Sequence, residues 1–182
     1  MSGLALLCHE DALPLEIAGL IGSWATTAED AIMWGHTVGG PVPADVVLAR
    51  ASDPGVIPYT LHTDTSGNEN PVAYGELWID DEEAEVEVAR LIVDPDLRGR
   101  GIGTQLAREL AACALAHYPD VDLRVRPDNL AARRCYENAG YCQVDPESER
   151  QWNIGQPIHY AWYRYRPPTT RQTDARGAVE EG

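Results

Sequence analysis

Three glycines and two arginines stand close together in the segment "DLRGRGIGTQL", residues 96–106. A strand-like run precedes this segment and a helix-like run follows it. Backbone N–H groups at the start of a helix point outward and favour an anion such as a phosphate. Arg98 and Arg100 add positive charge at the same place. The segment indicates either a phosphate-binding loop or a solvent-exposed turn that starts a helix, and the glycines alone do not separate the two.

Two common phosphate-binding motifs do not fit this segment. In the dinucleotide fingerprint GxGxxG, Thr104 would stand where the third glycine belongs. A P-loop needs a lysine before its Ser or Thr, and the chain has none, because all 14 of its basic residues are arginines. The same absence excludes enzymes that bind pyridoxal phosphate through a lysine Schiff base.

The elements around the glycines predict where such a loop would lie. Strand patterns over 72–80 and 84–93 flank the acidic tip "DDEE" and predict an antiparallel hairpin. A helix with apolar residues at helical spacing follows the glycines, and residues 121–126 alternate as a strand does. Residues 84–126 therefore predict a strand–helix–strand unit with two parallel strands and a right-handed crossover. Ligands of such sheets bind beyond the carboxyl ends of the strands, where the glycine segment stands.

The remaining patterns complete a single domain, which suits a chain of 182 residues. Asn129 is a good N-cap and Gly140 a good C-terminal residue for a helix between them. The tail over 167–182 has no apolar periodicity and predicts a mobile segment. Further strands are predicted over 4–10, 56–64, 141–145 and 156–166, and further helices over 11–24, 26–36 and 43–51.

Two motifs resemble those of the GNAT superfamily of N-acyltransferases. The first is Arg98-x-x-Gly101-x-Gly103, which resembles the acetyl-CoA loop of that superfamily. The second is "RPDNLAARRCYENAGY", residues 126–141, which is similar to its N-x-x-A-x-x-x-Y-E-x-x-G-F/Y segment. The resemblance implies an α+β GNAT fold over residues 1–166. That fold has a mixed, mostly antiparallel sheet with a parallel βαβ unit, and helices cover both faces.

The resemblance also implies a binding site for acetyl-CoA as co-substrate. The glycine loop would approach the pyrophosphate of the coenzyme, and one strand would run beside the pantetheine arm. An N–H group of that strand would polarise the acyl carbonyl, as an oxyanion hole does. Asn129 would cap its helix and hold the pantetheine amides. The implied cofactor-binding residues are Leu91, Ile92, Val93, Arg98, Gly99, Arg100, Gly101, Ile102, Gly103, Thr104 and Asn129.

Two side chains match the positions at which the superfamily carries its acid and base. Tyr136 lies seven residues after Asn129, and a phenol is protonated at neutral pH and can protonate the departing thiolate. Glu87 lies eleven residues before Arg98, where many GNAT enzymes carry a glutamate that takes a proton from the amine. Two alternatives stay open for Glu87. It could belong to a solvated hairpin tip and pair with Arg90, or Glu76 on the neighbouring strand could be the base.

Net charge, hydropathy and the spacing of cysteines and histidines limit the classes of ligand and partner that this chain can bind. The net charge of −15 disfavours nucleic acid and favours a cationic acceptor. No apolar run is long enough for a membrane span. The cysteines and histidines lack metal-ligand spacing, and Cys135 has no matched histidine that would make it a nucleophile.

We therefore expect a cytoplasmic N-acetyltransferase, monomeric or homodimeric, without a metal. It would move an acetyl group from acetyl-CoA to a primary amine of a small molecule or peptide by direct attack. The alternatives are a non-catalytic acyl-CoA-binding regulatory domain and an acyltransferase with another donor, either a longer acyl-CoA or an aminoacyl-tRNA.

Overall fold

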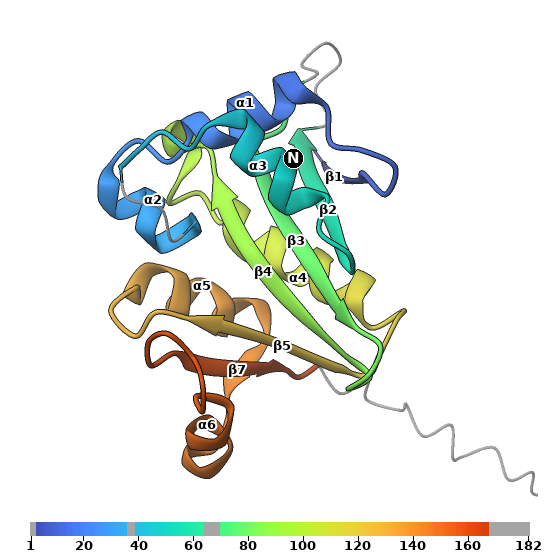
Figure 1. The fold of residues 1–182 in the computed structure, drawn as a ribbon, viewed down its shortest axis with the longest axis vertical. Helices are drawn as coiled ribbons and strands as arrows, with labels where there is room; N and C mark the ends of the chain where they lie inside the picture. Colours follow the sequence, from blue (N-terminus) through green and yellow to red (C-terminus); the bar gives the residue numbers. More distant parts are fainter. Residues whose placement is uncertain (1–2, 36–38, 64–69, 168–182) are drawn as a thin grey trace, which may run out of the picture.

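A mixed sheet forms the centre of residues 3–35, 39–63 and 70–167, the part of the chain that the computed structural model describes (Figure 1). Its strands are β1 (Leu4–Cys8), β2 (Val56–Thr63), β3 (Ala73–Asp80), β4 (Glu85–Val93), β5 (Asp120–Val125), β6 (Tyr141–Gln143) and β7 (Ala161–Tyr165). They lie in the order β1-β2-β3-β4-β5-β7-β6. All neighbours are antiparallel except β4 and β5, which are parallel. This topology confirms the predicted fold class.

Helices cover both faces of the sheet, as predicted. One face packs on α4 (Ile102–Ala114) and α5 (Leu130–Ala139), and the other packs on α1 (Leu15–Ser23), α2 (Ala28–Gly35) and α3 (Ala44–Ala51). Residues in β4 alternate between the two faces because side chains in a strand have a period of two. Val86 and Val88 enter the core against α4, whereas Glu87 lines a cavity on the opposite side.

The two parallel strands pair only over a short stretch. Glu85, Val86 and Glu87 of β4 face Asp120, Val121 and Asp122 of β5. Beyond Glu87 the strands diverge, and Figure 1 shows β5 turning away from β4 toward α5. The βαβ prediction is confirmed in its parallel pairing, and the divergence opens a gap at the carboxyl ends of both strands.

A β-bulge interrupts β4 at the edge of this gap. Glu76 of β3 faces Ala89, but Tyr74 faces Ile92, so a single residue of β3 lies opposite two residues of β4. The first of these two, Arg90, has a left-handed φ of 50°. The Trp34 indole in α2 donates a hydrogen bond of 2.7 Å to the Arg90 carbonyl. The α2 helix thus supports the irregular backbone of β4.

The sequence patterns misplaced some elements near the C-terminal end of the domain. The strand predicted over 156–166 begins only at Ala161, because Asn153 closes the preceding loop by bonding the backbone N–H and C=O of Tyr160. A helix, α6 (Pro146–Trp152), was not predicted. Its signal is present in the sequence, since the Asp145 side chain caps it and Pro146 occupies its first turn. Residues 168–182 of the predicted tail lie outside the described residues.

Candidate active site

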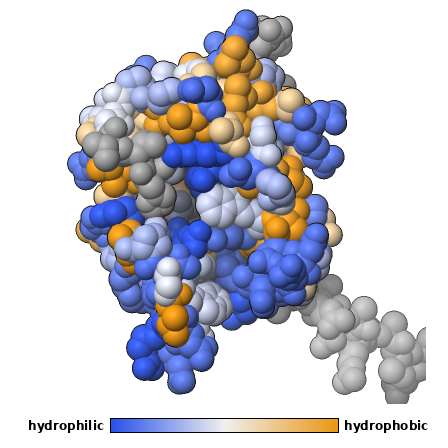
Figure 2. Space-filling view, viewed as in Figure 1, coloured by the Kyte–Doolittle hydropathy of each residue, from blue (hydrophilic) through white to orange (hydrophobic). Residues whose placement is uncertain are grey.

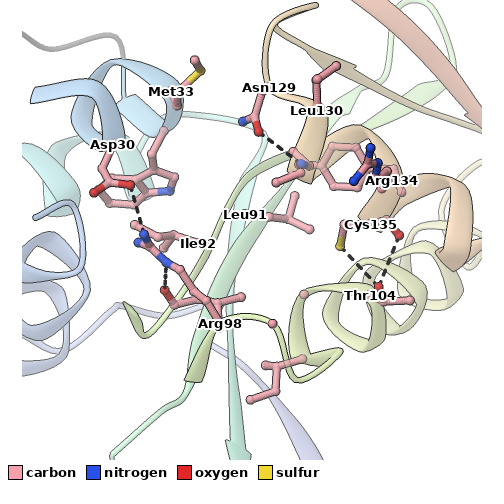
Figure 3. Close-up of a pocket in the computed structure, with 18 of the residues that line it drawn as sticks. Asp30, Met33, Leu91, Ile92, Arg98, Thr104, Asn129, Leu130, Arg134 and Cys135 are labelled. Atoms are coloured by element: carbon pink, nitrogen blue, oxygen red, sulfur yellow. Dashed lines mark hydrogen bonds and ion pairs between the residues drawn. The ribbon is translucent and has the colours of Figure 1, made fainter. Parts of the chain in front are cut away.

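A cavity of about 880 Å³ lies beside the carboxyl end of β4, between α2 on one side and α4 and α5 on the other (Figure 3). Figure 2 shows the hollowed face of the molecule, with hydrophilic side chains around the hollow. The walls of the cavity come from α2, the end of β4, the glycine loop, the start of α4 and one side of α5. Many of the predicted cofactor-binding residues line it together: Leu91, Ile92, Val93, Arg98, Gly99, Gly101, Ile102, Gly103, Thr104 and Asn129.

Glycine is required in the loop by its backbone conformation. Gly99 and Gly101 have φ values of +77° and +83°, which side chains with a Cβ rarely adopt. Gly101 is the N-cap of α4, and no side chain caps the helix there. The first N–H groups of α4 are therefore available to a ligand. At Gly103 a Cβ would come within 3.2 Å of the Cys135 sulfur, so glycine also lets α4 and α5 approach.

The two arginines of the loop, Arg98 and Arg100, do not both direct their positive charge into the cavity. The Arg98 guanidinium donates to Asp30 at 3.0 Å, to the Trp24 carbonyl at 2.9 Å and to the Val93 carbonyl at 3.2 Å. Arg98 thus ties the start of α2 to the end of β4, and its charge is paired. Arg100 is exposed and does not line the cavity. These two side chains therefore contribute little unpaired positive charge to the cavity.

A basic residue that sequence reasoning missed lies on the opposite wall. Arg134 in α5 lines the cavity near the first turn of α4, and Figure 3 shows it on the α5 side of the cavity. The sequence contained a signal for this role, because Arg134 stands between Asn129 and Tyr136 in the second motif. It adds a positive charge to the wall of the cavity that the glycine loop also lines.

Asn129 begins the helix that forms this wall. Its side-chain oxygen accepts the Ala132 N–H at 3.1 Å, which confirms the predicted N-cap. Gly140 ends the helix with a φ of +106°, as predicted. Between these caps the helix places Tyr136 on the cavity wall.

Tyr136 lies where the main cavity meets a second one of about 110 Å³. Its side chain is buried, and burial raises the pKa of its phenol well above the ordinary value. The hydroxyl therefore stays protonated at neutral pH. Burial also raises the pKa of the neighbouring Cys135 thiol, which contacts the Thr104 hydroxyl. A buried thiol of this kind is a poor nucleophile.

The second cavity contains Glu87 and a group of arginines and aromatic residues. Glu87 is 19% exposed and pairs with Arg124 of β5 at 3.1 Å. Burial raises the pKa of Glu87 to about 7, against the opposing effect of Arg124. The expected alternative partner, Arg90, pairs with Glu76 instead. The cavity is lined by Met33, Trp34, Trp78, Glu87, Ala89, Arg90, Leu91, Arg124, Val125, Arg126, Asn129, Ala132, Tyr136 and Tyr160.

Glu76 lies on the same face but in different surroundings. Its side chain is 1% exposed and lines neither cavity. It accepts hydrogen bonds from the Tyr74 hydroxyl at 2.8 Å, the Trp78 indole at 2.6 Å and the Arg90 guanidinium at 3.2 Å. A carboxylate with its oxygens engaged in this way has no access to a substrate amine. The geometry therefore favours Glu87 over Glu76 as a base.

The mixed sheet, its diverging parallel strands and the glycine-rich helix start define an acyltransferase of the GNAT type. A family model described as "Acetyltransferase (GNAT) family" matches residues 37–141, which is more than half of the chain. The chain belongs to this family of acetyltransferases.

Solved structures support the fold at low sequence identity. A structure of AAC(6')-Ib with paromomycin and acetyl-CoA has a TM-score of 0.65 and 15% identity, covering 95% of this chain and 99% of that one. A chimera of the spermidine N-acetyltransferase SpeG from Vibrio cholerae with hSSAT has a TM-score of 0.62 and 17% identity, covering 90% and 93%. A sequence search of curated proteins finds no significant match.

Two further observations concern the described residues only. None of their helices is long and apolar enough to span a membrane. Their His, Cys, Asp and Glu side chains form no group of three or more that could hold a metal ion.

Proposed function

We propose that this protein transfers an acetyl group from acetyl-CoA to a primary amine by direct attack. The observation that carries the proposal is that the two cavities share part of their walls. Leu91, Asn129 and Tyr136 line both, so the path from the glycine loop to Glu87 passes the tyrosine. A thioester held in the larger cavity would present its carbonyl to an amine in the smaller one.

The residues along this path supply the parts that the reaction needs. The open N–H groups of α4 and Arg134 would hold the coenzyme phosphates. The bulge in β4 interrupts the strand pairing and would free a backbone N–H for the acyl carbonyl. The main chain of Leu91, Ile92 and Val93 would run along the pantetheine arm, and Asn129 would contact its amides.

Proton transfer would involve the two candidate side chains. Glu87 would take a proton from the substrate ammonium, directly or through a water molecule, and the neutral amine would attack the thioester carbon. When the tetrahedral intermediate collapses, the C–S bond breaks and Tyr136 would protonate the departing thiolate. After the attack the nitrogen still carries one proton too many. It would lose this proton to the tyrosinate, which returns Tyr136 to its protonated form.

The charge of the protein supports a basic amine as the acceptor. Each arginine of the smaller cavity is paired with a carboxylate: Arg90 with Glu76, Arg124 with Glu87, and Arg126 with Asp128. The net charge of −15 therefore dominates the field that an approaching substrate meets. Two of the similar structures are named as an aminoglycoside acetyltransferase and a spermidine N-acetyltransferase, and aminoglycosides and spermidine are polycations.

A turnover screen tests this proposal. Acetyl-CoA is incubated with a panel of cationic, neutral and acidic primary amines, and release of the free thiol is measured. We expect the best acceptor to be cationic, with a KM that rises between 0.01 and 0.1 M salt, because the Debye length falls from about 30 to about 10 Å. Turnover of neutral amines alone, or a KM that does not change with salt, would contradict the acceptor class. The absence of thiol release with every amine would contradict the reaction.

A further inference from the structure

The Glu87–Arg124 ion pair lies beside a cavity, and several further contacts hold the Arg124 guanidinium in place. Arg124 forms an ion pair with Glu87, with its Nε 3.1 Å from a carboxylate oxygen, and its Nη1 donates a hydrogen bond of 3.1 Å to the Gln156 side chain. Three aromatic rings surround the guanidinium: Trp78 at 5.6 Å, Tyr160 at 5.5 Å and Trp162 at 5.4 Å. We call these three rings, together with Gln156, the Arg124 cage.

The cage is itself anchored to the buried part of the sheet. The Trp78 indole N–H donates to Glu76, and Arg90 stacks on the Trp78 ring at 4.8 Å. The Trp78 ring therefore contacts two guanidinium groups, and its N–H is held by a buried carboxylate. On the other side, Arg124 and Trp162 are paired neighbours on β5 and β7. Arg124 is thus fixed from β3, from β7 and from the loop before β7.

We propose that Arg124 is the positioning residue for Glu87 and that the cage sets its orientation and charge. The inference rests on the proposed role of Glu87 as the base. The ion pair places the Arg124 Nε beside one carboxylate oxygen of Glu87, and Glu87 itself lines the smaller cavity. The cage prevents the guanidinium from following the carboxylate or from turning toward the substrate. Arg124 would keep Glu87 ionised in the pH range where the enzyme must accept a proton.

Other charged groups near Glu87 act on it from the same two strands. Asp122 of β5 and Glu85 of β4 raise the pKa of Glu87, whereas Arg90 lowers it. Asp122 is neutralised by Arg164 through two hydrogen bonds of 2.7 Å. From the other elements, Tyr136, Tyr160 and Arg126 line the same cavity. Arg124 is the cation in direct contact with Glu87, so its removal should have the largest effect on the carboxylate.

The test replaces Arg124 by methionine, which keeps an unbranched stem against the three rings and removes the charge. Without its partner, Glu87 becomes protonated instead of remaining as an unpaired buried charge, so the fold is expected to survive. The titration of Glu87 is followed by NMR of protein with 13C-labelled glutamate, with the Glu87 signal assigned by its loss in Glu87→Gln. We expect the pKa of Glu87 to rise by about one to three units in Arg124→Met.

Kinetics provide the second measurement. The acidic limb of the pH profile of kcat/KM should move to higher pH by the same amount, with one amine used for all variants. Arg124→Lys retains the charge and should return the limb close to its original position. Arg126→Met removes an arginine that lines the same cavity but pairs with the exposed Asp128, and it should leave the limb in place.

The outcomes separate the two levels of the proposal. If Arg124→Met lowers activity equally at every pH and leaves the Glu87 titration unchanged, Arg124 has only a packing role and the inference is wrong. If Arg124→Met does not fold, the proposal is tested with Arg124→Lys alone. An acidic limb that shifts to higher pH in Arg124→Lys, although the charge is retained, would also overturn the electrostatic role. If Glu87→Gln keeps the limb, the base assignment itself fails, whatever the arginine variants show.

Discussion

The two ends of the cavity are built from different parts of the chain. The glycine end is formed by main-chain N–H groups and close helix packing, and its loop is one continuous segment between Val93 and Thr104. The Glu87 end is formed by side chains from β3, β4, β5 and the residues before β7. One end depends on backbone conformation, and the other depends on which strands pair.

This difference has an energetic side. The glycine end places few charges in buried surroundings, because its donors are N–H groups that a helix start leaves open in any case. The Glu87 end holds a carboxylate whose pKa burial has raised to about 7, beside an arginine enclosed by aromatic rings. We expect changes at the glycine end to affect coenzyme binding, and changes at the Glu87 end to affect proton transfer and stability.

The largest effect is expected where the two ends meet, at Tyr136. Tyr136→Phe should lower kcat by roughly 10²–10⁴-fold, the usual contribution of a positioned acid, and leave coenzyme affinity unchanged. Steady-state kinetics and coenzyme titration measure the two quantities. Tyr165→Phe is the control, because Tyr165 packs on Tyr141 and does not line either cavity. A Tyr136→Phe enzyme with the kcat of the wild type would mean that the tyrosine only packs.

The next effect separates the two carboxylates on neighbouring strands. Glu87→Gln should lower kcat/KM by about 10²-fold or more and abolish the acidic limb of its pH profile, because the proton acceptor is gone. Glu76→Gln should keep that limb. It should instead destabilise the fold by roughly 3 kcal/mol, since it breaks a buried ion pair with Arg90. Loss of the limb in Glu76→Gln but not in Glu87→Gln would reverse the assignment.

A smaller effect is expected at the glycine end. Gly101→Asp should weaken coenzyme binding at least about tenfold, because a carboxylate would stand at the open N–H groups of α4. Gly155→Asp is a matched control, since both glycines have left-handed φ values, +83° and +80°, and neither has an atom within 4 Å of an added Cβ. Both variants should lose roughly 1 kcal/mol of stability from backbone strain. Coenzyme affinity is measured by calorimetry. If Gly101→Asp and Gly155→Asp bind the coenzyme equally well, the phosphates do not bind at the start of α4.

The same contrast explains how much the sequence could predict. The glycine end was predictable because its signals are local: glycines at positive φ, an apolar helix pattern and the N-cap Asn129 all lie within short segments. The parallel pairing of β4 and β5 followed from the order of the elements. The loop conformation that directs Arg98 to Asp30 was not predictable, because Asp30 belongs to a helix 68 residues earlier in the chain.

The Glu87 end was predictable only in part. On a regular strand Glu87 and Arg90 would lie on opposite faces, but the bulge at Arg90 directs that side chain to Glu76. The true partner of Glu87, Arg124, is on another strand, and no local pattern marks the pair. The strand predicted over 156–166 included the loop that supplies Gln156 and Tyr160, because the bonds of Asn153 that close this loop are not visible in a local pattern.

The last expected effect concerns the free energy of unfolding instead of activity or binding, and it tests whether the Glu87 end is costly to fold. The pKa of Glu87 is raised from 4.5 to about 7, so the folded state binds its proton more tightly than the unfolded state does. This contribution to stability is fully present below pH 4.5 and is lost as the pH rises through 7. Glu87→Gln cannot lose it, and at pH 8 it should be more stable than the wild type by up to about 3 kcal/mol. Thermal unfolding should show an increase of roughly 2–4 °C per kcal/mol at pH 8 and no difference near pH 4. A Glu87→Gln variant that melts at or below the wild-type temperature at pH 8 would show that Arg124 and the cage fully offset the burial of the charge.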